Sequence, residues 1–132
     1  MHSLYFDGCS KGNPGKAGAG FVIYENDIEI YSESKFLGTQ TNNFAEYSGL
    51  LLGLKKAKEM DITELNVYGD SMLVIKQMNG EYKVKAAGLL TLYNLAKQYS
   101  NKMNVTFQHV YRDKNARADE LANDAINNYH NK

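Results

Sequence analysis

The chain has 132 residues, 43% hydrophobic and 23% charged, which favours a single globular domain over residues 1–132 with a buried core. Fifteen basic and fifteen acidic residues give a net charge of zero, which excludes a strongly basic duplex binder but not a locally basic face. One cysteine, no signal-like N-terminus and no run of roughly 18 apolar residues exclude a disulfide framework, a secretion signal and a membrane span, so we expect a soluble cytoplasmic protein.

The first third of the sequence predicts three strands. Residues 3–6 are apolar and aromatic and end at an Asp-Gly pair, which indicates a strand entering a turn. Residues 9–18 contain several glycines and the only proline, and are predicted to be a loop. Residues 19–24 and 28–37 are rich in β-forming residues and flank Glu-Asn-Asp, so we expect a hairpin there.

The rest of the sequence predicts four helices and two strands. Between residues 42 and 60, Tyr47, Leu50, Leu54 and Ala57 recur at helical spacing, which predicts a long amphipathic helix. The elements expected after it are a strand at 65–68, a short helix at 71–78, a helix at 87–100, a strand at 105–110 and a helix at 115–129.

This order of elements predicts an α/β fold. Three consecutive strands joined by short connections form an antiparallel meander, whereas strands joined through helices are parallel. We therefore expect a five-stranded mixed sheet, with a three-stranded meander plus two parallel strands, and helices on its faces.

Four acidic residues stand where they could meet at one edge of that sheet. Asp7 follows the first predicted strand and Asp70 the fourth, and ligands of α/β sheets gather beyond the strand ends. Glu46 lies near the start of the long helix and Asp119 near the start of the last one. Carboxylates suit a hard cation such as Mg²⁺, and two such ions can activate water for phosphodiester hydrolysis.

Three of the four acids also have a purely structural interpretation, whereas Asp7 resists one because acids are depleted in strands. Glu46 follows Asn43 by three residues, which is close to a capping box. Asp70 precedes a short helix and could cap it, and Asp119 would suit the positive end of a helix dipole. Taken singly, these structural roles are the more common ones, so the spacing alone leaves both interpretations open.

Four sequence blocks, each containing one of these acids, carry a resemblance to a known family. In chain order they are DGCSKGNPG at 7–15, TNNFAE at 41–46, YGDS at 68–71 and NARADELA at 115–122. One block would be weak evidence, but four in order span almost the whole chain. Together they resemble the signature of the type 1 ribonuclease H family.

The resemblance implies a ribonuclease H-like fold and an endonuclease that cuts the RNA strand of an RNA–DNA hybrid, leaving 3′-hydroxyl and 5′-phosphate ends. It implies two Mg²⁺ ions, with Mn²⁺ as a substitute, when substrate is bound, and a monomer without an obligate protein partner. The implied metal ligands are Asp7, Glu46, Asp70 and Asp119, and the implied hybrid-binding positions are Gly8, Cys9, Asn13, Asn42 and Asn43.

Two departures mark a compact form of the family. Residues 80–85 are too few for the basic protrusion that grips the DNA strand in many members, and Lys83 with Lys85 would be a reduced version of it. The flexible-loop histidine before the last acid is also missing. His109 belongs to the last predicted strand, so Arg112 is the natural substitute, with a solvated arginine paired to Asp113 or Glu120 as the alternative.

Two other functions remain open from the sequence. The neutral net charge and the missing histidine would suit a hybrid-binding module of the same fold that barely cleaves. A DNA resolvase or integrase would share the acids, but Asn13, Asn42 and Asn43 suit contacts to the ribose 2′-hydroxyl, since an amide both donates and accepts.

Overall fold

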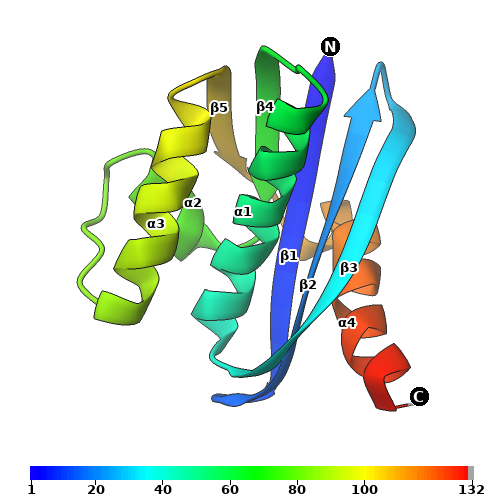
Figure 1. The fold of residues 1–132 in the computed structure, drawn as a ribbon, viewed down its shortest axis with the longest axis vertical. Helices are drawn as coiled ribbons and strands as arrows, with labels where there is room; N and C mark the ends of the chain where they lie inside the picture. The colour runs from blue at the N-terminus through cyan, green and yellow to red at the C-terminus, as the bar shows by residue number, and fades with distance from the viewer. Residues whose placement is uncertain (131–132) are drawn as a thin grey trace.

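The computed structural model describes residues 1–130, which form a sheet with helices on both faces (Figure 1). The strands are β1 (His2–Gly12), β2 (Gly15–Glu25), β3 (Ile28–Gln40), β4 (Glu64–Gly69) and β5 (Asn104–His109). The helices are α1 (Asn42–Glu59), α2 (Met72–Met78), α3 (Ala87–Ser100) and α4 (Ala116–His130), with a short 3₁₀ turn, η1 (Arg112–Lys114), before α4.

The sheet has the strand order β3-β2-β1-β4-β5. Strands β1, β2 and β3 pair antiparallel, and β4 pairs parallel with both β1 and β5. The α/β fold and the mixed sheet predicted from the sequence are therefore confirmed. Helices α1 and α3 cover one face and α4 the other, as Figure 1 shows.

The predicted loop at residues 9–18 is wrong, because β1 and β2 continue through it as a long hairpin. Their pairing runs on to Gly12 and Gly15 at the tip. The glycines here serve close packing as well as turning: a Cβ on Gly18 would lie 2.3 Å from the Ala122 carbonyl oxygen of α4. Glycine in a strand interior often marks such a close backbone approach, which the sequence pattern does not separate from a loop.

Helix α1 packs against β1 and β2 and lies beside α3. A Cβ on Gly8 of β1 would lie 2.1 Å from the Ala45 carbonyl carbon, so the strand and the start of α1 are in direct backbone contact. The apolar residues predicted for this helix, with Tyr47, Leu50 and Leu54 among them, are fully buried. This packing places the residue after Ala45, which is Glu46, beside β1.

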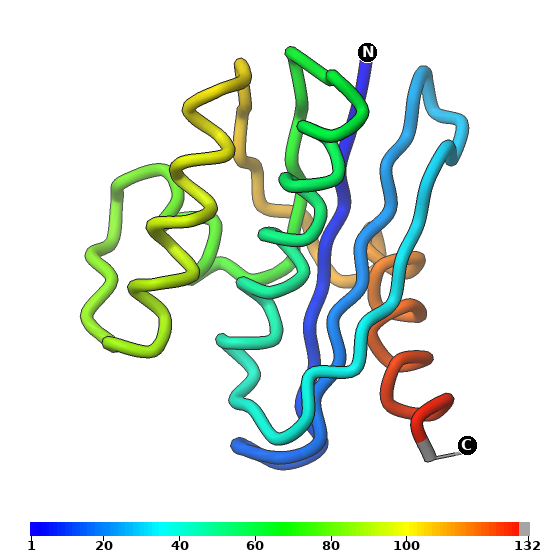
Figure 2. Tube along the Cα trace, in the orientation of Figure 1, coloured from blue at the N-terminus to red at the C-terminus, as the bar shows by residue number. Residues whose placement is uncertain are grey.

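Residues from distant parts of the chain hold these layers together. The Tyr47 hydroxyl donates a buried 2.6 Å hydrogen bond to Gln77 Oε1 of α2. Figure 2 shows the tip of the β1–β2 hairpin passing below the start of α1.

Within residues 1–130, no helix is long and apolar enough to cross a membrane.

Candidate active site

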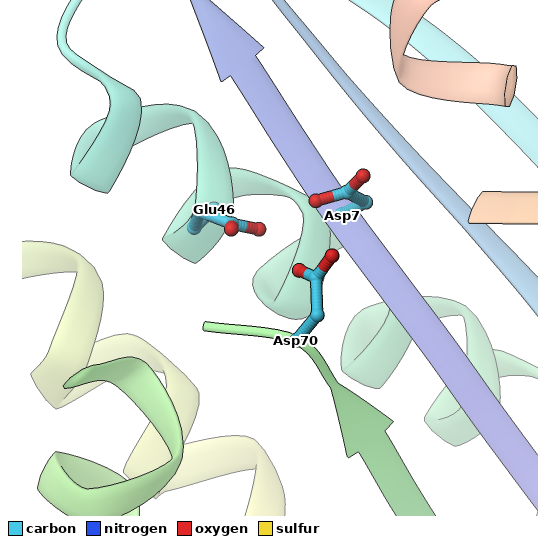
Figure 3. A group of neighbouring side chains, drawn as sticks. All are labelled: Asp7, Glu46 and Asp70. Carbon is cyan, nitrogen blue, oxygen red and sulfur yellow. The ribbon is translucent and has the colours of Figure 1, made fainter. Parts of the chain in front are cut away.

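Three carboxylates from three elements meet at one point of the sheet. The parallel pairing of β1 and β4 ends at Phe6 and Gly69. Asp7, still within β1, and Asp70, directly after β4, are the next residues along the chain. Glu46 reaches the same point from α1. One oxygen from each acid lies within 4.8 Å of the others, and Figure 3 shows the three side chains converging.

The structural alternatives for two of these acids are wrong, because other residues cap the helices. Thr41 Oγ1 accepts the N-cap hydrogen bond of α1 from the Phe44 amide at 3.1 Å. Ser71 Oγ caps α2 by accepting from the Val74 amide at 3.2 Å. Neither Glu46 nor Asp70 caps a helix. Helix capping therefore does not explain why these two acids lie together.

Burial and mutual repulsion make the acid group costly to ionise. Asp7 is 5% exposed, and burial, followed by the Asp70 charge, raises its pKa to about 7. Burial, followed by the charges of Asp7 and Asp70, raises the Glu46 pKa well above its usual value. Glu46 Oε1 is buried and has no hydrogen-bond partner among residues 1–130. A buried, unpartnered carboxylate oxygen in an acid group fits a divalent cation.

The fourth acid borders the same site from the other face of the sheet. Asp119 lies in the first turn of α4 and lines the acid cavity, although it is outside the tight group of three. Its place in the first turn also agrees with the helix-dipole interpretation. The acid cavity, about 350 Å³, is lined by Asp7, Gly8, Cys9, Lys11, Asn42, Asn43, Glu46, Asp70, Arg112, Asp119 and Asn123.

Arg112 stands at the mouth of the acid cavity. Its side chain is 87% exposed, and its Nε lies 3.9 Å from Asp70 Oδ2. Pairing with Glu120, one of the predicted alternatives, is not found, since Glu120 makes a 2.6 Å ion pair with Arg117 instead. The guanidinium therefore faces both the acids and solvent.

The asparagines join the β1–β2 hairpin to the start of α1. Asn42 Oδ1 accepts from the Ser10 amide at 2.8 Å, and Asn13 Oδ1 accepts from the Asn42 amide at 3.1 Å. Asn42 and Asn43 line the acid cavity together with Gly8 and Cys9. Asn13 instead lines a neighbouring cavity that Asn43 also borders. Four of the five predicted hybrid-binding positions thus share the cavity of the acids.

The two predicted basic contacts lie elsewhere. Lys83 and Lys85 are exposed in the connector before α3, where they line a separate surface pocket beside Tyr82. The connector is held by a 3.3 Å hydrogen bond from Gln77 Nε2 to the Lys83 carbonyl. The structure does not bring these lysines to the acid cavity.

Comparison with known proteins identifies the family. The family described as "Reverse transcriptase-like" matches residues 5–125. Ribonuclease H of Francisella tularensis subsp. novicida is 36% identical over 141 residues, covering 92% of this chain and 88% of that protein. The chain belongs to the ribonuclease H family. The family predicted from the four sequence blocks is therefore confirmed.

Other relatives of this ribonuclease H family member differ in length. Bifunctional protein Rv2228c of Mycobacterium tuberculosis is 45% identical over 123 residues. The chain spans only 34% of that relative's length. A solved structure of LC11-RNase H1 in complex with RNA/DNA hybrid has a TM-score of 0.93 and 36% identity, covering 98% of this chain and 99% of that one.

Three residues near the acids of this ribonuclease H domain were not predicted. Asn115 is 1% exposed and donates through Nδ2 to the Phe6 carbonyl at 2.9 Å. Lys11 and Asn123 line the acid cavity and are hydrogen-bonded to each other at 2.8 Å. For Asn123 a signal existed, because it lies four residues after Asp119 and so on the same face of a helix.

Proposed function

We propose that this chain hydrolyses the RNA strand of RNA–DNA hybrids and leaves 3′-hydroxyl and 5′-phosphate ends. The observation that carries the proposal is the convergence of Asp7, Glu46 and Asp70, with Glu46 Oε1 buried and unpartnered among residues 1–130. The likeness to LC11-RNase H1, solved with an RNA/DNA hybrid, supports the choice of substrate.

In this proposal Asp7, Glu46, Asp70 and Asp119 hold Mg²⁺, with Mn²⁺ as a substitute and two ions present with substrate. Ions held by these residues would supply the chemistry of an activated water and of charge neutralisation at the leaving oxygen. The raised pKa of Asp7, about 7, means that the acid group releases protons as it takes up the cations. Metal uptake should therefore weaken as the pH falls below neutrality.

The asparagines would distinguish the RNA strand. The Oδ1 of the exposed Asn42 is engaged by the Ser10 amide, so its Nδ2 is the group left to act as a donor. Asn43 is exposed beside it at the cavity. The 2′-hydroxyl donates and accepts, so it can satisfy such amides, whereas deoxyribose has no hydroxyl at that position. Arg112, at the cavity mouth, would orient the scissile phosphate through its planar fork.

An assay with end-labelled substrates tests the proposal. Hybrid, duplex DNA, duplex RNA and both single strands are each incubated with Mg²⁺, Mn²⁺ or chelator. We expect cuts in the RNA strand of the hybrid with either metal and none in chelator. Hybrid binding without cleavage in either metal would identify a binding module instead, and cleavage of duplex DNA would point to a resolvase or integrase.

A further inference from the structure

A three-residue network approaches the acid cavity from the side of α4. Asn123 lies one helical turn after Asp119, and its Nδ2 donates to the Asp119 carbonyl at 2.9 Å and to Asp119 Oδ1 at 3.2 Å. Lys11 Nζ, from the β1–β2 hairpin, donates to Asn123 Oδ1 at 2.8 Å. All three side chains line the acid cavity.

We propose that Asn123 is a positioning residue for Asp119 and that Lys11 sets the direction in which the Asn123 amide faces. This inference rests on the proposed metal-dependent hydrolysis, because it concerns the fourth acid of that site. Asn123 and Lys11 would then influence the reaction only indirectly, through Asp119.

The physical basis is the polarity of the amide. An asparagine side chain has a donor end and an acceptor end. Lys11 is a pure donor, so it selects the oxygen end and leaves the Nδ2 end for Asp119. Asp119 favours the same orientation, because a flipped amide would turn its oxygen toward the Asp119 carboxylate and carbonyl, and Lys11 adds a donor that holds the oxygen end. The ammonium therefore strengthens this one orientation of the amide.

The consequence for Asp119 is a fixed carboxylate. Asp119 lies outside the tight group of three acids, so the direction of its oxygens decides whether it reaches a cation held by the others. Asn123 donates to Oδ1, which restricts how the carboxylate can turn and leaves Oδ2 outside this network. Hydrogen-bonding partners of metal ligands commonly change metal affinity or activity by roughly 10–100-fold when removed.

Metal dependence provides the first test. We compare Asn123→Ala with Asn127→Ala, an exposed position one turn further along α4, as the matched control. We expect Asn123→Ala to need roughly 10–100-fold more Mn²⁺ for half-maximal single-turnover cleavage, with most of the rate recovered at saturation. The KM for hybrid should stay within about twofold of wild type. A half-saturating Mn²⁺ concentration equal to that of Asn127→Ala would overturn the proposal.

Nuclear magnetic resonance of the metal-free protein tests the role of Lys11 without any activity. The side-chain amide proton shifts of wild-type Asn123 should differ from those of the exposed Asn127, because the Asn123 donors are engaged by Asp119. In Lys11→Met those signals should move toward the values of Asn127, and in Lys11→Arg they should stay. Unchanged Asn123 signals in Lys11→Met would overturn the proposal. This measurement decides even if the wild-type protein cleaves no hybrid, which would be a failure of the proposed function alone.

A double-mutant cycle separates this role from a direct contact of Lys11 with the hybrid. If Lys11 acts through Asn123, then Lys11→Met should add no more than about twofold to the effect of Asn123→Ala on the Mn²⁺ requirement. If Lys11 instead binds the hybrid, the two effects should multiply and Lys11→Met should raise KM. That second result would overturn the role given to Lys11.

Discussion

Asn115 and Phe6 join the start of α4 to the strand residue that precedes Asp7. Asn115 Nδ2 donates a 2.9 Å hydrogen bond to the Phe6 carbonyl oxygen, and Asn115 is 1% exposed. The Asn115 carbonyl in turn accepts from the Asp119 amide at 3.1 Å. One buried residue thus ties together, through its side chain and its backbone, the elements that carry two of the four acids.

We predict that Asn115→Ala destabilises the fold, because it leaves the buried Phe6 carbonyl without that donor. Such a loss costs about 1–3 kcal/mol, which should lower Tm by roughly 4–12 °C for a domain of this size. Asn127→Ala, exposed on the same helix, should change Tm by no more than about 2 °C. Equal melting temperatures for the two variants in calorimetry would show that the Asn115 bond contributes nothing.

We predict that Asp7→Asn and Asp70→Asn each abolish cleavage of the hybrid while leaving its binding in Ca²⁺ within about threefold of wild type. Both acids would hold cations, whereas affinity comes mainly from phosphate and sugar contacts. Asp27→Asn, in the exposed β2–β3 turn, is the matched control and should cleave normally. Near wild-type cleavage by both purified active-site variants would contradict the acid site.

We predict that the metal-free protein loses stability as the pH rises. The folded-state pKa of Asp7 is about 7, above the usual value of about 3.9 for an unfolded aspartate. The folded state therefore binds the proton more tightly. Its stabilising contribution is complete below about pH 4 and is lost as the pH passes through 7.

The measurement is the difference in unfolding free energy between wild type and Asp7→Asn in chelator. We expect Asp7→Asn to gain about 1–3 kcal/mol relative to wild type between pH 4 and pH 8. Saturating Mg²⁺ at pH 8 should reduce this advantage, because it stabilises wild type more than the variant. A difference in unfolding free energy that stays constant over this pH range would mean that folding does not raise the pKa of Asp7.

Much of the fold was predictable because its signals are local. The spacing of Tyr47, Leu50 and Leu54 predicted α1, and the turn residues at 25–27 predicted the β2–β3 hairpin. The hairpin of β1 and β2 was missed around Gly12 and Gly18, because glycine in a sequence indicates a turn and a close backbone approach equally well. Only the position of α4 against the sheet decides between them.

The site residues also divide into those with a local sequence signal and those whose place depends on the tertiary structure. Asp70 was predictable because it follows a strand that runs parallel to its neighbour. Asp7 was found for a partly wrong reason: it stands where the pairing with β4 ends, but β1 itself continues to Gly12. The bond between Lys11 and Asn123 was not predictable, because it joins residues 112 positions apart through side-chain orientations that no local pattern encodes. Lys83 and Lys85 were expected near the substrate as a reduced version of the family's basic protrusion, and they lie in a pocket apart from the acids.

The role of Arg112 can be separated from folding. Its side chain is 87% exposed and its 3.9 Å approach to Asp70 is that of a surface ion pair, which contributes at most about 1 kcal/mol. Arg112→Ala should therefore keep Tm within about 4 °C of wild type. Any large loss of cleavage in this variant then reports on the reaction and not on the fold.

We predict that Arg112→Ala lowers single-turnover cleavage by roughly tenfold to a thousandfold at saturating Mg²⁺, the effect of removing one oriented donor from developing charge. Arg112→Lys should recover only part of the rate, because an ammonium restores the charge without the planar fork. Lys114→Ala, exposed in the same 3₁₀ turn, is the matched control and should stay near wild type. Cleavage by Arg112→Ala at the wild-type rate would mean that the guanidinium is a solvated surface group and that the acids act without it.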